Sequence, residues 1–344
     1  MRAVVIHAAH DLRIDPVEVA PPVAGEVRVR LERGGICGSD LHYYHHGRIG
    51  SIVLKHPMVL GHEVAGIVTE VGAGVSRVRP GDRVALSPSR ACGQCRYCQA
   101  GQQMHCLNMR FYGSAMPFPH VHGAFQEEII AVEAQCFPVP KETSAGEAAM
   151  CEPLAVCLHA VRRAGPLMGR RVLVTGLGPI GVLTIAAARH AGAAEIVATD
   201  VTSAPFDLAR KLGADRCLDV ASDPAALEPY GADKGAFDVM FECSGNEKAL
   251  TGALAAVRPL SRIIQVGLAA AFTLPLNVIV AKEIELCGTF RFHEEFGIAA
   301  DLIASRRIDV RPLISASVPF QRSVEAFELA SDRARAMKVQ LEFS

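Results

Sequence analysis

A glycine-rich turn at residues 176–181 restricts the possible folds of this 344-residue chain more than any other feature. The turn reads Gly176-Leu177-Gly178-Pro179-Ile180-Gly181 and fits the pattern GxGxxG. An apolar run at residues 172–175 precedes it as a buried strand, and residues 180–190 follow as an apolar helix. In such a unit the first glycine makes the tight turn, the second lets the backbone approach a pyrophosphate, and the third lets helix and strand pack closely. The sequence therefore predicts a dinucleotide bound at the N-terminus of this helix by the residues of the turn.

An acidic residue at the end of the next strand predicts which dinucleotide binds. Asp200 lies 19 residues after Gly181, at the end of the apolar run 196–200. A carboxylate at that place accepts hydrogen bonds from the adenosine ribose and repels a 2′-phosphate. Residues 201–205 contain no Arg or Lys, so the pattern favours NAD over NADP. The alternative is a glycine turn in an ordinary α/β domain, with Asp200 as a strand-end cap.

Strands and helices alternate around this turn. Apolar strand runs occur at 172–175, 196–200, 238–242 and 262–266, and helix-forming segments occur at 180–190 and 206–212. Alternating βα units predict an α/β fold with a doubly wound parallel sheet covered by helices. The first 140 residues differ, because they are rich in Gly, Pro, His and Cys and contain short strand-like runs separated by turns. They predict a small β-barrel-like domain.

Four cysteines within fifteen residues predict a metal site. Cys92, Cys95, Cys98 and Cys106 follow the spacing C-x2-C-x2-C-x7-C, with glycines at 93 and 101 to supply turns. Clustered thiolates on such turns suit tetrahedral zinc, and four protein ligands leave no open position. We therefore expect a structural zinc. An iron–sulfur cluster and four free thiols are the alternatives.

A second set of ligand types predicts a catalytic metal. Cys37 and His62 supply sulfur and nitrogen, and Glu63 or Glu152 could supply an oxygen. A catalytic zinc has about three protein ligands and one open position for water or substrate. The alternative treats Cys37 as a buried thiol and His62 as a core histidine. Near these residues, the hydroxyl of Ser39 and the imidazole of His42 are close enough in sequence to pass a proton.

Composition excludes several classes of function. The 35 basic and 36 acidic residues give a net charge of -1, so we expect neither a nucleic acid nor a membrane surface as partner. The N-terminal residues lack the apolar run of a signal peptide, and the most apolar stretch, 263–281, is interrupted by Gln265 and Pro275. Eleven cysteines, an odd number without a secretion signal, favour metal or active-site thiols over disulfides. The expected compartment is the cytoplasm.

Together, these motifs resemble the zinc-containing medium-chain dehydrogenase/reductase family over the whole chain. Residues 37–62 are similar to its sorbitol dehydrogenase branch, and residues 109–125 are more similar to the L-idonate 5-dehydrogenase subgroup. The resemblance implies a mainly β GroES-like catalytic domain, formed by residues 1–143 and 286–344 with a zinc lobe at about 88–112. A Rossmann NAD-binding domain, residues 144–285, is inserted between them. Two zinc ions per chain and a homotetramer or dimer are also implied.

The resemblance assigns a role to each candidate residue. Cys37, His62 and a glutamate bind the catalytic zinc; Glu63 and Glu152 are both carried as metal-site residues, and Glu152 is alternatively the residue that holds the zinc water. Ser39 accepts the proton of the substrate hydroxyl, and His42 relays it to solvent. Substrate hydroxyls contact Tyr43 and Arg291, and the nicotinamide ribose lies beside Val266, Gly267 and Leu268.

The substrate implied by the subgroup is a sugar acid, L-idonate, oxidised at C5 to 5-dehydro-D-gluconate. Its carboxylate needs a cation, and the candidates in the distinguishing loops are Arg48, Arg110, His120 and His122. One alternative is a neutral polyol, sorbitol or xylitol, oxidised by the same residues. A non-enzymatic nucleotide-binding or zinc-lobe interaction protein is the alternative from another class.

Overall fold

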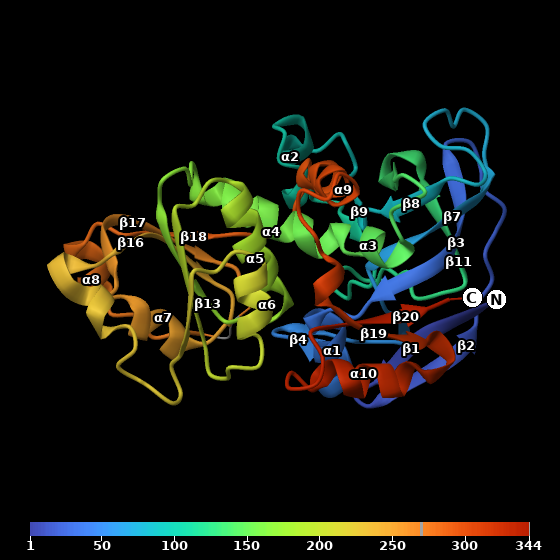
Figure 1. Cartoon of the computed structure of the whole chain (residues 1–344). Coiled ribbons are helices and arrows are strands. Elements are labelled where there is room, and N and C mark those ends of the chain that lie inside the picture. Colours follow the sequence, from blue (N-terminus) through green and yellow to red (C-terminus); the bar gives the residue numbers. More distant parts are fainter. Residues whose placement is uncertain (269–270, 344) are drawn as a thin grey trace. The chain divides into compact units, whose positions relative to one another are not determined.

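The computed structural model describes residues 1–268 and 271–343, and these form two compact units. Unit 1 contains Met1–Glu152 and His293–Ser344, and unit 2 contains Pro153–Phe292. Both ends of the chain therefore belong to unit 1, as the blue and red ribbons of Figure 1 show. Unit 2 is an insertion in the chain of unit 1.

Unit 1 is built mainly from β-strands, and most of them pair antiparallel. Its largest sheet has the order β12-β8-β7-β3-β20-β19, with β11 pairing with one end of β3. Strand β3 follows the period-2 rule, since Val27, Val29 and Leu31 are buried and alternate with more exposed residues. The strands of unit 1 are β1 (Arg2–Ala8), β2 (Asp11–Pro16), β3 (Glu26–Gly35), β4 (Arg48–Ile49), β5 (Ile52–Val53), β6 (Met58–Val59), β7 (Glu63–Val71), β8 (Arg83–Leu86), β9 (Ser89–Arg90), β10 (Arg110–Phe111), β11 (Glu128–Val132), β12 (Cys136–Pro138), β19 (Ile314–Pro319) and β20 (Lys338–Glu342).

The helices of unit 1 are short and lie between these strands in the sequence. They are α1 (Gly38–His46), α2 (Arg96–Gln99), α3 (Ala145–Ala149), α9 (Glu295–Ala304) and α10 (Ser323–Ser331), with 3-10 turns η1 (Gln103–His105), η2 (Glu133–Gln135), η4 (Arg311–Leu313) and η5 (Phe320–Arg322). One hydrophobic core joins segments from both ends of the unit, including Leu31, Phe125, Phe320 and Leu341. The GroES-like domain predicted from the resemblance is confirmed, and its C-terminal strands β19 and β20 complete the main sheet.

Unit 2 is the predicted parallel α/β domain. Among the described residues its sheet has six strands, all parallel, in the order β15-β14-β13-β16-β17-β18. The strands are β13 (Arg171–Thr175), β14 (Glu195–Asp200), β15 (Arg216–Asp219), β16 (Phe237–Glu242), β17 (Val257–Gln265) and β18 (Glu285–Gly288). The connecting helices are α5 (Pro179–His190), α6 (Phe206–Lys211), α7 (Glu247–Ala253) and α8 (Leu276–Ala281), with η3 (Glu228–Lys234) and, before β13, α4 (Cys151–Ala164). The strand order changes direction at β13, where the glycine turn follows, so the doubly wound prediction is confirmed.

The unit boundaries lie a few residues beyond the predicted 143/144 and 285/286. Helix α3 contacts β3, β7 and β8, so the chain stays in unit 1 until Glu152. Strand β18 pairs with β17, so the chain stays in unit 2 until Phe292. The sequence of β18 gives a weak signal because Glu285 and Leu286 are exposed at the edge of the sheet.

Glu147 ties α3 to the C-terminal part of unit 1. Its carboxylate accepts hydrogen bonds from the backbone N–H and hydroxyl of Ser144, at 3.0 and 2.7 Å, and from Arg306 Nη1 at 2.8 Å. Burial raises the pKa of Glu147, but these hydrogen bonds lower it by more, so the net shift is downward from 4.5. A carboxyl with a lowered folded-state pKa stabilises the fold above its unfolded pKa and loses that contribution in acid.

Glu147→Gln should therefore destabilise the protein by about 1 kcal/mol at neutral pH, since Arg306 is partly exposed and screened. The difference from wild type should shrink as the pH falls below about 4.5. Thermal melts at neutral pH and near pH 3 measure it, with the exposed Glu142→Gln as control. A difference that does not change with pH would contradict this account.

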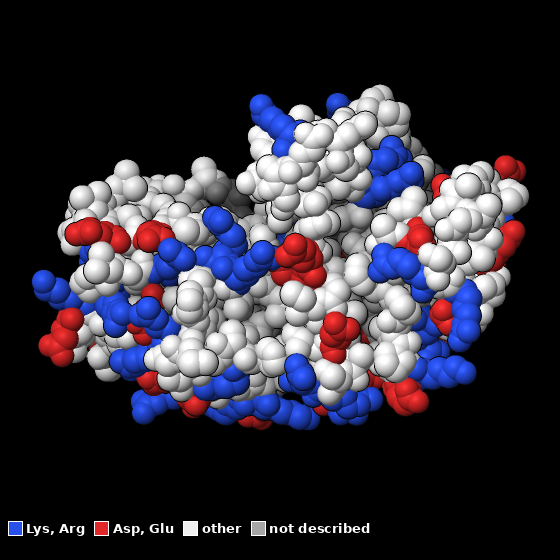
Figure 2. Space-filling view, turned by 90° about the horizontal axis from the view of Figure 1, so that it is seen from above, with Lys and Arg blue, Asp and Glu red and all other residues white. Residues whose placement is uncertain are grey.

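The surface carries charges of both signs. On the face shown in Figure 2, Lys and Arg side chains are interspersed with Asp and Glu side chains, in keeping with the net charge of -1. In the described part of the chain, no helix is both long enough and apolar enough to cross a membrane. The apolar stretch 263–281 falls within that statement except for residues 269 and 270, which lie outside the described residues.

Candidate metal centres and nucleotide site

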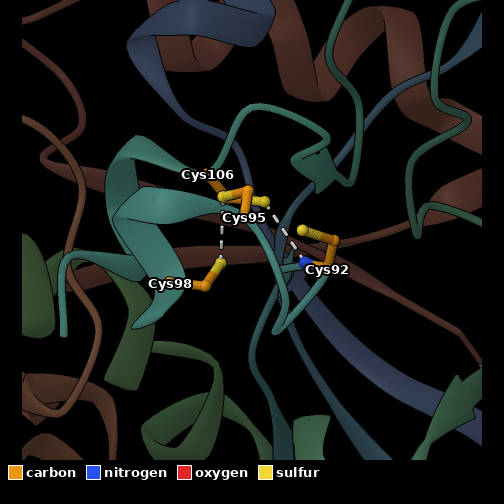
Figure 3. A group of neighbouring side chains, drawn as sticks. All are labelled: Cys92, Cys95, Cys98 and Cys106. Carbon is orange, nitrogen blue, oxygen red and sulfur yellow. Dashed lines mark hydrogen bonds between the residues drawn. The ribbon is translucent and has the colours of Figure 1, made fainter. Parts of the chain in front are cut away.

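The four lobe cysteines come together as the spacing predicts. The sulfurs of Cys92, Cys95, Cys98 and Cys106 all lie within 4.8 Å of one another, and Figure 3 shows them gathered at one place. Helix α2, which begins after Cys95, brings Cys98 Sγ to 3.6 Å from Cys95 Sγ. No disulfide links them, since all four are free thiols. Four sulfurs at this separation surround a point where one metal ion fits.

The backbone around the lobe favours thiolates. The N–H groups of Cys98 and Leu107 lower the pKa of Cys95 to about 6. Backbone N–H groups also lower the pKa of Cys92, while burial raises that of Cys98 to about 12. Cys106 Sγ accepts hydrogen bonds from the backbone N–H of Cys92 at 3.2 Å and of Asn108 at 3.4 Å. Hydrogen-bond donors directed at sulfur are what a thiolate-ligated metal site provides.

A second group of donors lies in unit 1 at the start of α1 and β7. Cys37 is the residue before α1, and His62 and Glu63 lie at the start of β7. Their Sγ, imidazole nitrogen and carboxylate oxygen all lie within 4.8 Å of one another. His62 and Glu63 are buried, and Cys37 is partly buried. Burial and the Glu63 carboxylate raise the pKa of the Cys37 thiol to about 12, and a cation bound here would reverse that effect.

Asp40 fixes the geometry of this group. Its buried carboxylate accepts hydrogen bonds from the backbone N–H of Cys37 at 3.0 Å and of Gly61 at 3.2 Å. One oxygen also lies 3.8 Å from Nδ1 of His62. A carboxylate behind a histidine orients the ring and leaves Nε2 as the ligand atom. Asp40 thus connects the two ligand-bearing segments and sets the direction of the imidazole.

Lys338 of β20 neutralises Glu63. Its Nζ donates to both carboxylate oxygens, at 2.8 and 2.7 Å, and to the carbonyl of Ile36 at 3.1 Å. Both side chains are almost completely buried, at 3% and 1% exposure. Burial lowers the pKa of Lys338, but the charge of Glu63 and its hydrogen bonds raise it by more. The pair is therefore a buried salt bridge whose carboxylate still has lone pairs directed elsewhere.

Glu152 lies close to the same group, in the first turn of α4. It is buried, and burial raises its pKa to about 8, while the electrostatic influence of His62 lowers it and that of Glu63 raises it. Its carboxyl therefore lies protonated beside the Cys37–His62–Glu63 group when no cation is bound. Such a group carries a proton at neutral pH or becomes a carboxylate when a cation is near.

Ser39 and His42 lie on α1 beside the metal-type ligands. The Ser39 hydroxyl is 3.5 Å from His62 Nε2. His42 follows three residues later on the same face of α1 and is exposed, with its pKa lowered by partial burial and by His46 and His45. The pair reaches from the donor group to the surface, as a proton path requires.

The donor set fits a zinc ion. Nδ1 of His62 is buried, has no hydrogen-bond partner among the described residues and faces the Asp40 carboxylate at 3.8 Å, so no protein hydrogen bond occupies that side of the ring. Sulfur, nitrogen and carboxylate oxygen are the three ligand types of catalytic zinc, and three ligands leave a position open. The four-thiol lobe fits a closed, structural zinc.

The glycine turn has the local structure that pyrophosphate binding needs. Gly176 has φ +85, and a Cβ on it would lie 2.7 Å from Ser244, so no other residue fits. A Cβ on Gly181 would overlap the carbonyl oxygen of Gly176. The space beside Gly178 is open within 4 Å, and Pro179 begins α5 directly after it. An anion can therefore approach the backbone at Gly178 and the helix N-terminus.

Asp200 contacts the turn as well as its own strand end. One carboxylate oxygen accepts from the backbone N–H of Leu177 at 2.6 Å, and the other from Val201 at 2.7 Å and Thr202 at 3.2 Å. Asp200 therefore caps the end of its strand and also lies beside the glycine turn, so the structure contains the features of both interpretations. The carboxylate stands at the carboxyl end of β14, the place of the ribose ligand in such folds.

Known proteins share both units. Residues 23–141 match the family model of the alcohol dehydrogenase GroES-like domain, and residues 179–305 match that of the zinc-binding dehydrogenases. The chain is 43% identical over 316 residues to the L-idonate 5-dehydrogenase (NAD(P)(+)) of Escherichia coli strain K12, covering 92% of this chain and 91% of the relative. The chain belongs to the zinc-dependent medium-chain dehydrogenase/reductase family.

Two further comparisons support this assignment. The dehydrogenase is 38% identical over 339 residues to the sorbitol dehydrogenase of Arabidopsis thaliana, covering 95% of this chain and 91% of the relative. Its structure matches the crystal structure of L-idonate 5-dehydrogenase from E. coli with a TM-score of 0.94 and 39% identity, covering 99% of this chain and 98% of that one. The predicted family, its sorbitol and idonate dehydrogenase branches, and an enzymatic function are confirmed.

The remaining predicted residues of the dehydrogenase are distributed over both units. Tyr43 is buried in unit 1, where its hydroxyl accepts a hydrogen bond from the backbone N–H of Ala115 at 3.1 Å. In unit 2, Val266 and Gly267 follow β17, and their N–H groups bond the carbonyl of Glu242 at 2.8 Å. Leu268 is exposed beside them, and Arg291 has φ +55 with its guanidinium over Phe290. These five residues stay predictions as ligand contacts.

The four candidate ligands of a substrate carboxylate differ in burial and in hydrogen bonding. His120 is buried, with Nε2 accepting from the backbone N–H of Lys55 at 2.9 Å and Nδ1 facing the carbonyl of Pro117 at 3.0 Å. Nδ1 of His122 accepts from the backbone N–H of Val59 at 3.2 Å. Both rings hold the loop in place through these hydrogen bonds. Arg48 in β4 and Arg110 in β10 are exposed.

Sequence reasoning missed Asp40 and Lys338. Asp40 lies between two flagged residues, Ser39 and His42, and a buried acid within a ligand motif would have been a signal. Lys338 is 275 residues from Glu63, so no local pattern connects them.

Proposed function

We propose that this dehydrogenase oxidises a secondary hydroxyl of a sugar acid with NAD, and that the substrate is L-idonate, converted at C5 to 5-dehydro-D-gluconate. The observation that carries the chemistry is the buried Cys37–His62–Glu63 donor group with Ser39 beside it. The similarity to relatives named L-idonate 5-dehydrogenase from Escherichia coli and Vitis vinifera supports the substrate.

We assign the catalytic zinc to Cys37, His62 and Glu63, because their donor atoms lie within 4.8 Å of one another. Glu152, buried beside them, is assigned to hold a water or the substrate hydroxyl. When bound, zinc supplies Lewis-acid polarisation of the alcohol oxygen. The structural zinc is assigned to the four lobe cysteines, which gives two zinc ions per chain.

NAD, when bound, would accept the C–H hydrogen as hydride, and the residues of α1 remove the hydroxyl proton. Ser39, 3.5 Å from His62 Nε2, accepts the substrate hydroxyl proton and releases its own hydroxyl proton to His42, which passes a proton to solvent. Partial burial and neighbouring imidazoles lower the pKa of His42, so its ring is neutral and able to accept a proton at neutral pH. Asp40 keeps His62 in the orientation that directs Nε2 at the ligand group.

Neutral polyols are the second candidate substrates, favoured by the 38% identity to a sorbitol dehydrogenase. Initial rates of NADH formation with L-idonate, D-gluconate, D-sorbitol and xylitol decide between the two. We expect kcat/KM for L-idonate to lead by at least about tenfold, equivalent to ~1.4 kcal/mol of transition-state preference. A lead for sorbitol or xylitol would leave the zinc chemistry intact and overturn the sugar-acid assignment.

Asp200→Asn should weaken the preference for NAD. Removing the negative charge removes the repulsion of a 2′-phosphate, so the ratio of kcat/KM for NAD to that for NADP should fall by about tenfold or more. Asp219→Asn is the matched control, because Asp219 caps the end of the adjacent strand through Ala221 and Ser222 and has no bond to the glycine turn. An unchanged ratio in D200N, or an equal change in D219N, would refute the role of Asp200.

We also propose that the enzyme forms a homodimer or homotetramer in the cytoplasm. Strand β18 is an open sheet edge, and exposed apolar residues lie on it and on the neighbouring segments, namely Leu260, Leu276, Val280 and Leu286. An open edge with such a surface favours a second copy of the chain. Light scattering that gives only the 36.7 kDa monomer mass would contradict this. Free thiols throughout the described residues suit a reducing compartment.

A further inference from the structure

Unit 1 contains a polar groove that none of the proposed metal ligands lines. Its volume is about 510 Å³, which is within the range of small-molecule sites. Its polar side chains include Arg90, Arg110, His122 and Gln126, and its apolar lining includes Ile129. Three of the residues that the sequence marked as anion ligands, Arg110 among them, therefore line one groove.

This groove lies on the face of β10 that is turned away from the catalytic donors. The Phe111 ring is 5.6 Å from the His62 ring, so Phe111 faces the metal-type group. Successive residues of a strand point to opposite faces, so Arg110 points the other way. A ligand of Arg110 is therefore not the substrate held at His62.

Two arginines face each other across this ribbon. Strands β9 and β10 pair antiparallel with Arg90 directly opposite Arg110. Neither guanidinium has an ion pair or hydrogen bond with any residue in 1–268 or 271–343. Like charges directly opposite on a two-stranded ribbon destabilise it. An anion between the two guanidinium groups removes that repulsion.

The histidine adds a neutral donor. Nδ1 of His122 accepts from the backbone N–H of Val59 at 3.2 Å, so the proton of the ring is on Nε2. Burial and the nearby His56 and His120 lower the pKa of His122, which keeps this tautomer at neutral pH. The acidic residue lining the groove, Glu18, is exposed and forms no ion pair with either arginine among the described residues. It offsets one of the two positive charges.

We propose that this groove binds a phosphate group, as inorganic phosphate or as the phosphate of a small monoester, at a site separate from catalysis. Two guanidinium forks match the tetrahedral oxyanion, because each can donate two parallel N–H bonds. His122 and Gln126 line the same groove, and His122 Nε2–H and the second N–H of the Gln126 amide, whose nitrogen also donates to the Gly123 carbonyl at 3.4 Å, can donate to the remaining oxygens. A carboxylate needs only one fork, which is why phosphate is preferred here.

Calorimetric titration of the zinc-loaded enzyme tests the proposal. Saturating NAD is present in every titration so that the N-terminus of α5, a second place for phosphate, is occupied. The probes are inorganic phosphate, glycerol 2-phosphate and acetate. The double variant R90Q/R110Q is compared with wild type and with R79Q, which removes an exposed arginine from the same unit.

We expect wild type and R79Q to bind both phosphate probes at millimolar concentration or below, and R90Q/R110Q to bind them at least about tenfold more weakly. The monoester binding more tightly than inorganic phosphate would identify the monoester as the ligand, and the reverse order would identify the free ion. Turnover at saturating substrate should be unchanged in R90Q/R110Q. Equal phosphate binding in the double variant, no binding in wild type, or tighter binding of acetate than of phosphate would overturn the proposal.

Discussion

Replacing Cys37 by serine is expected to lower kcat by about 10³-fold and leave the fold intact. Lewis-acid polarisation is worth several kcal/mol of transition-state stabilisation, and each ~1.4 kcal/mol is a factor of ten in rate. Cys37 supplies the only sulfur of the Cys37–His62–Glu63 group. The lobe that we assign to structural zinc is formed by other residues, so the melting temperature should change little.

Cys217→Ser is the matched control for this variant. Cys217 is also partly exposed and free, but it lies on β15 of unit 2, with its thiol directed at the carbonyl of Phe206. It should retain the rate of the wild type. Steady-state rates at saturating substrate and NAD, with circular dichroism for the fold, make the comparison. Wild-type kcat in C37S would rule out Cys37 as a ligand of the catalytic metal.

Lys338→Met is expected to produce the largest loss of stability, about 3–5 kcal/mol. The variant leaves Glu63 as a buried carboxylate without its cation, because Lys338 Nζ is the donor to both of its oxygens. For a domain of this size the melting temperature should fall by roughly 10 °C. Zinc bound at Glu63 compensates part of the missing charge, so the loss should be smaller in zinc-saturated than in zinc-depleted protein.

The double variant K338M/E63Q separates loss of the pair from loss of packing. Replacing both members of a buried ion pair is much less costly than removing one, so the double variant should recover most of the melting temperature. Melting curves of wild type, both single variants and the double variant form the test. If K338M melts like wild type, or if E63Q fails to rescue it, the Lys338–Glu63 pair does not have the energetic role assigned here.

Much of the fold was predictable because its signals are local in sequence. The run Val172–Thr175, the glycine turn and the apolar helix after it are contiguous, and the structure forms them as β13, the turn and α5. The four lobe cysteines also lie within one short segment, so their spacing predicts their meeting. Closely spaced glycines or cysteines of this kind suit few local structures, so their spacing alone predicts the turn and the four-thiol lobe.

Other features depend on contacts that no local pattern records. Lys338 reaches Glu63 only because β20 pairs with β3 in the middle of the main sheet. His120 and His122 were predicted as ligands of a substrate carboxylate, but no local pattern records that one nitrogen of each ring accepts a hydrogen bond from the backbone of residues 55–59. The edge strand β18 has no apolar run, because one of its sides faces solvent. The predicted end of unit 2 at residue 285 therefore cut off a strand that pairs with β17.

The zinc content of the wild type and of two cysteine variants, measured by atomic absorption after dialysis against a weak chelator, decides whether Cys37, His62 and Glu63 hold a second metal ion. We predict two zinc ions per chain in wild type and one in C37S. Cys98→Ser should lose the lobe zinc instead, since Cys98 is one of its four sulfurs. One zinc ion in wild type, or two in C37S, would contradict the assignment of the second metal to Cys37, His62 and Glu63.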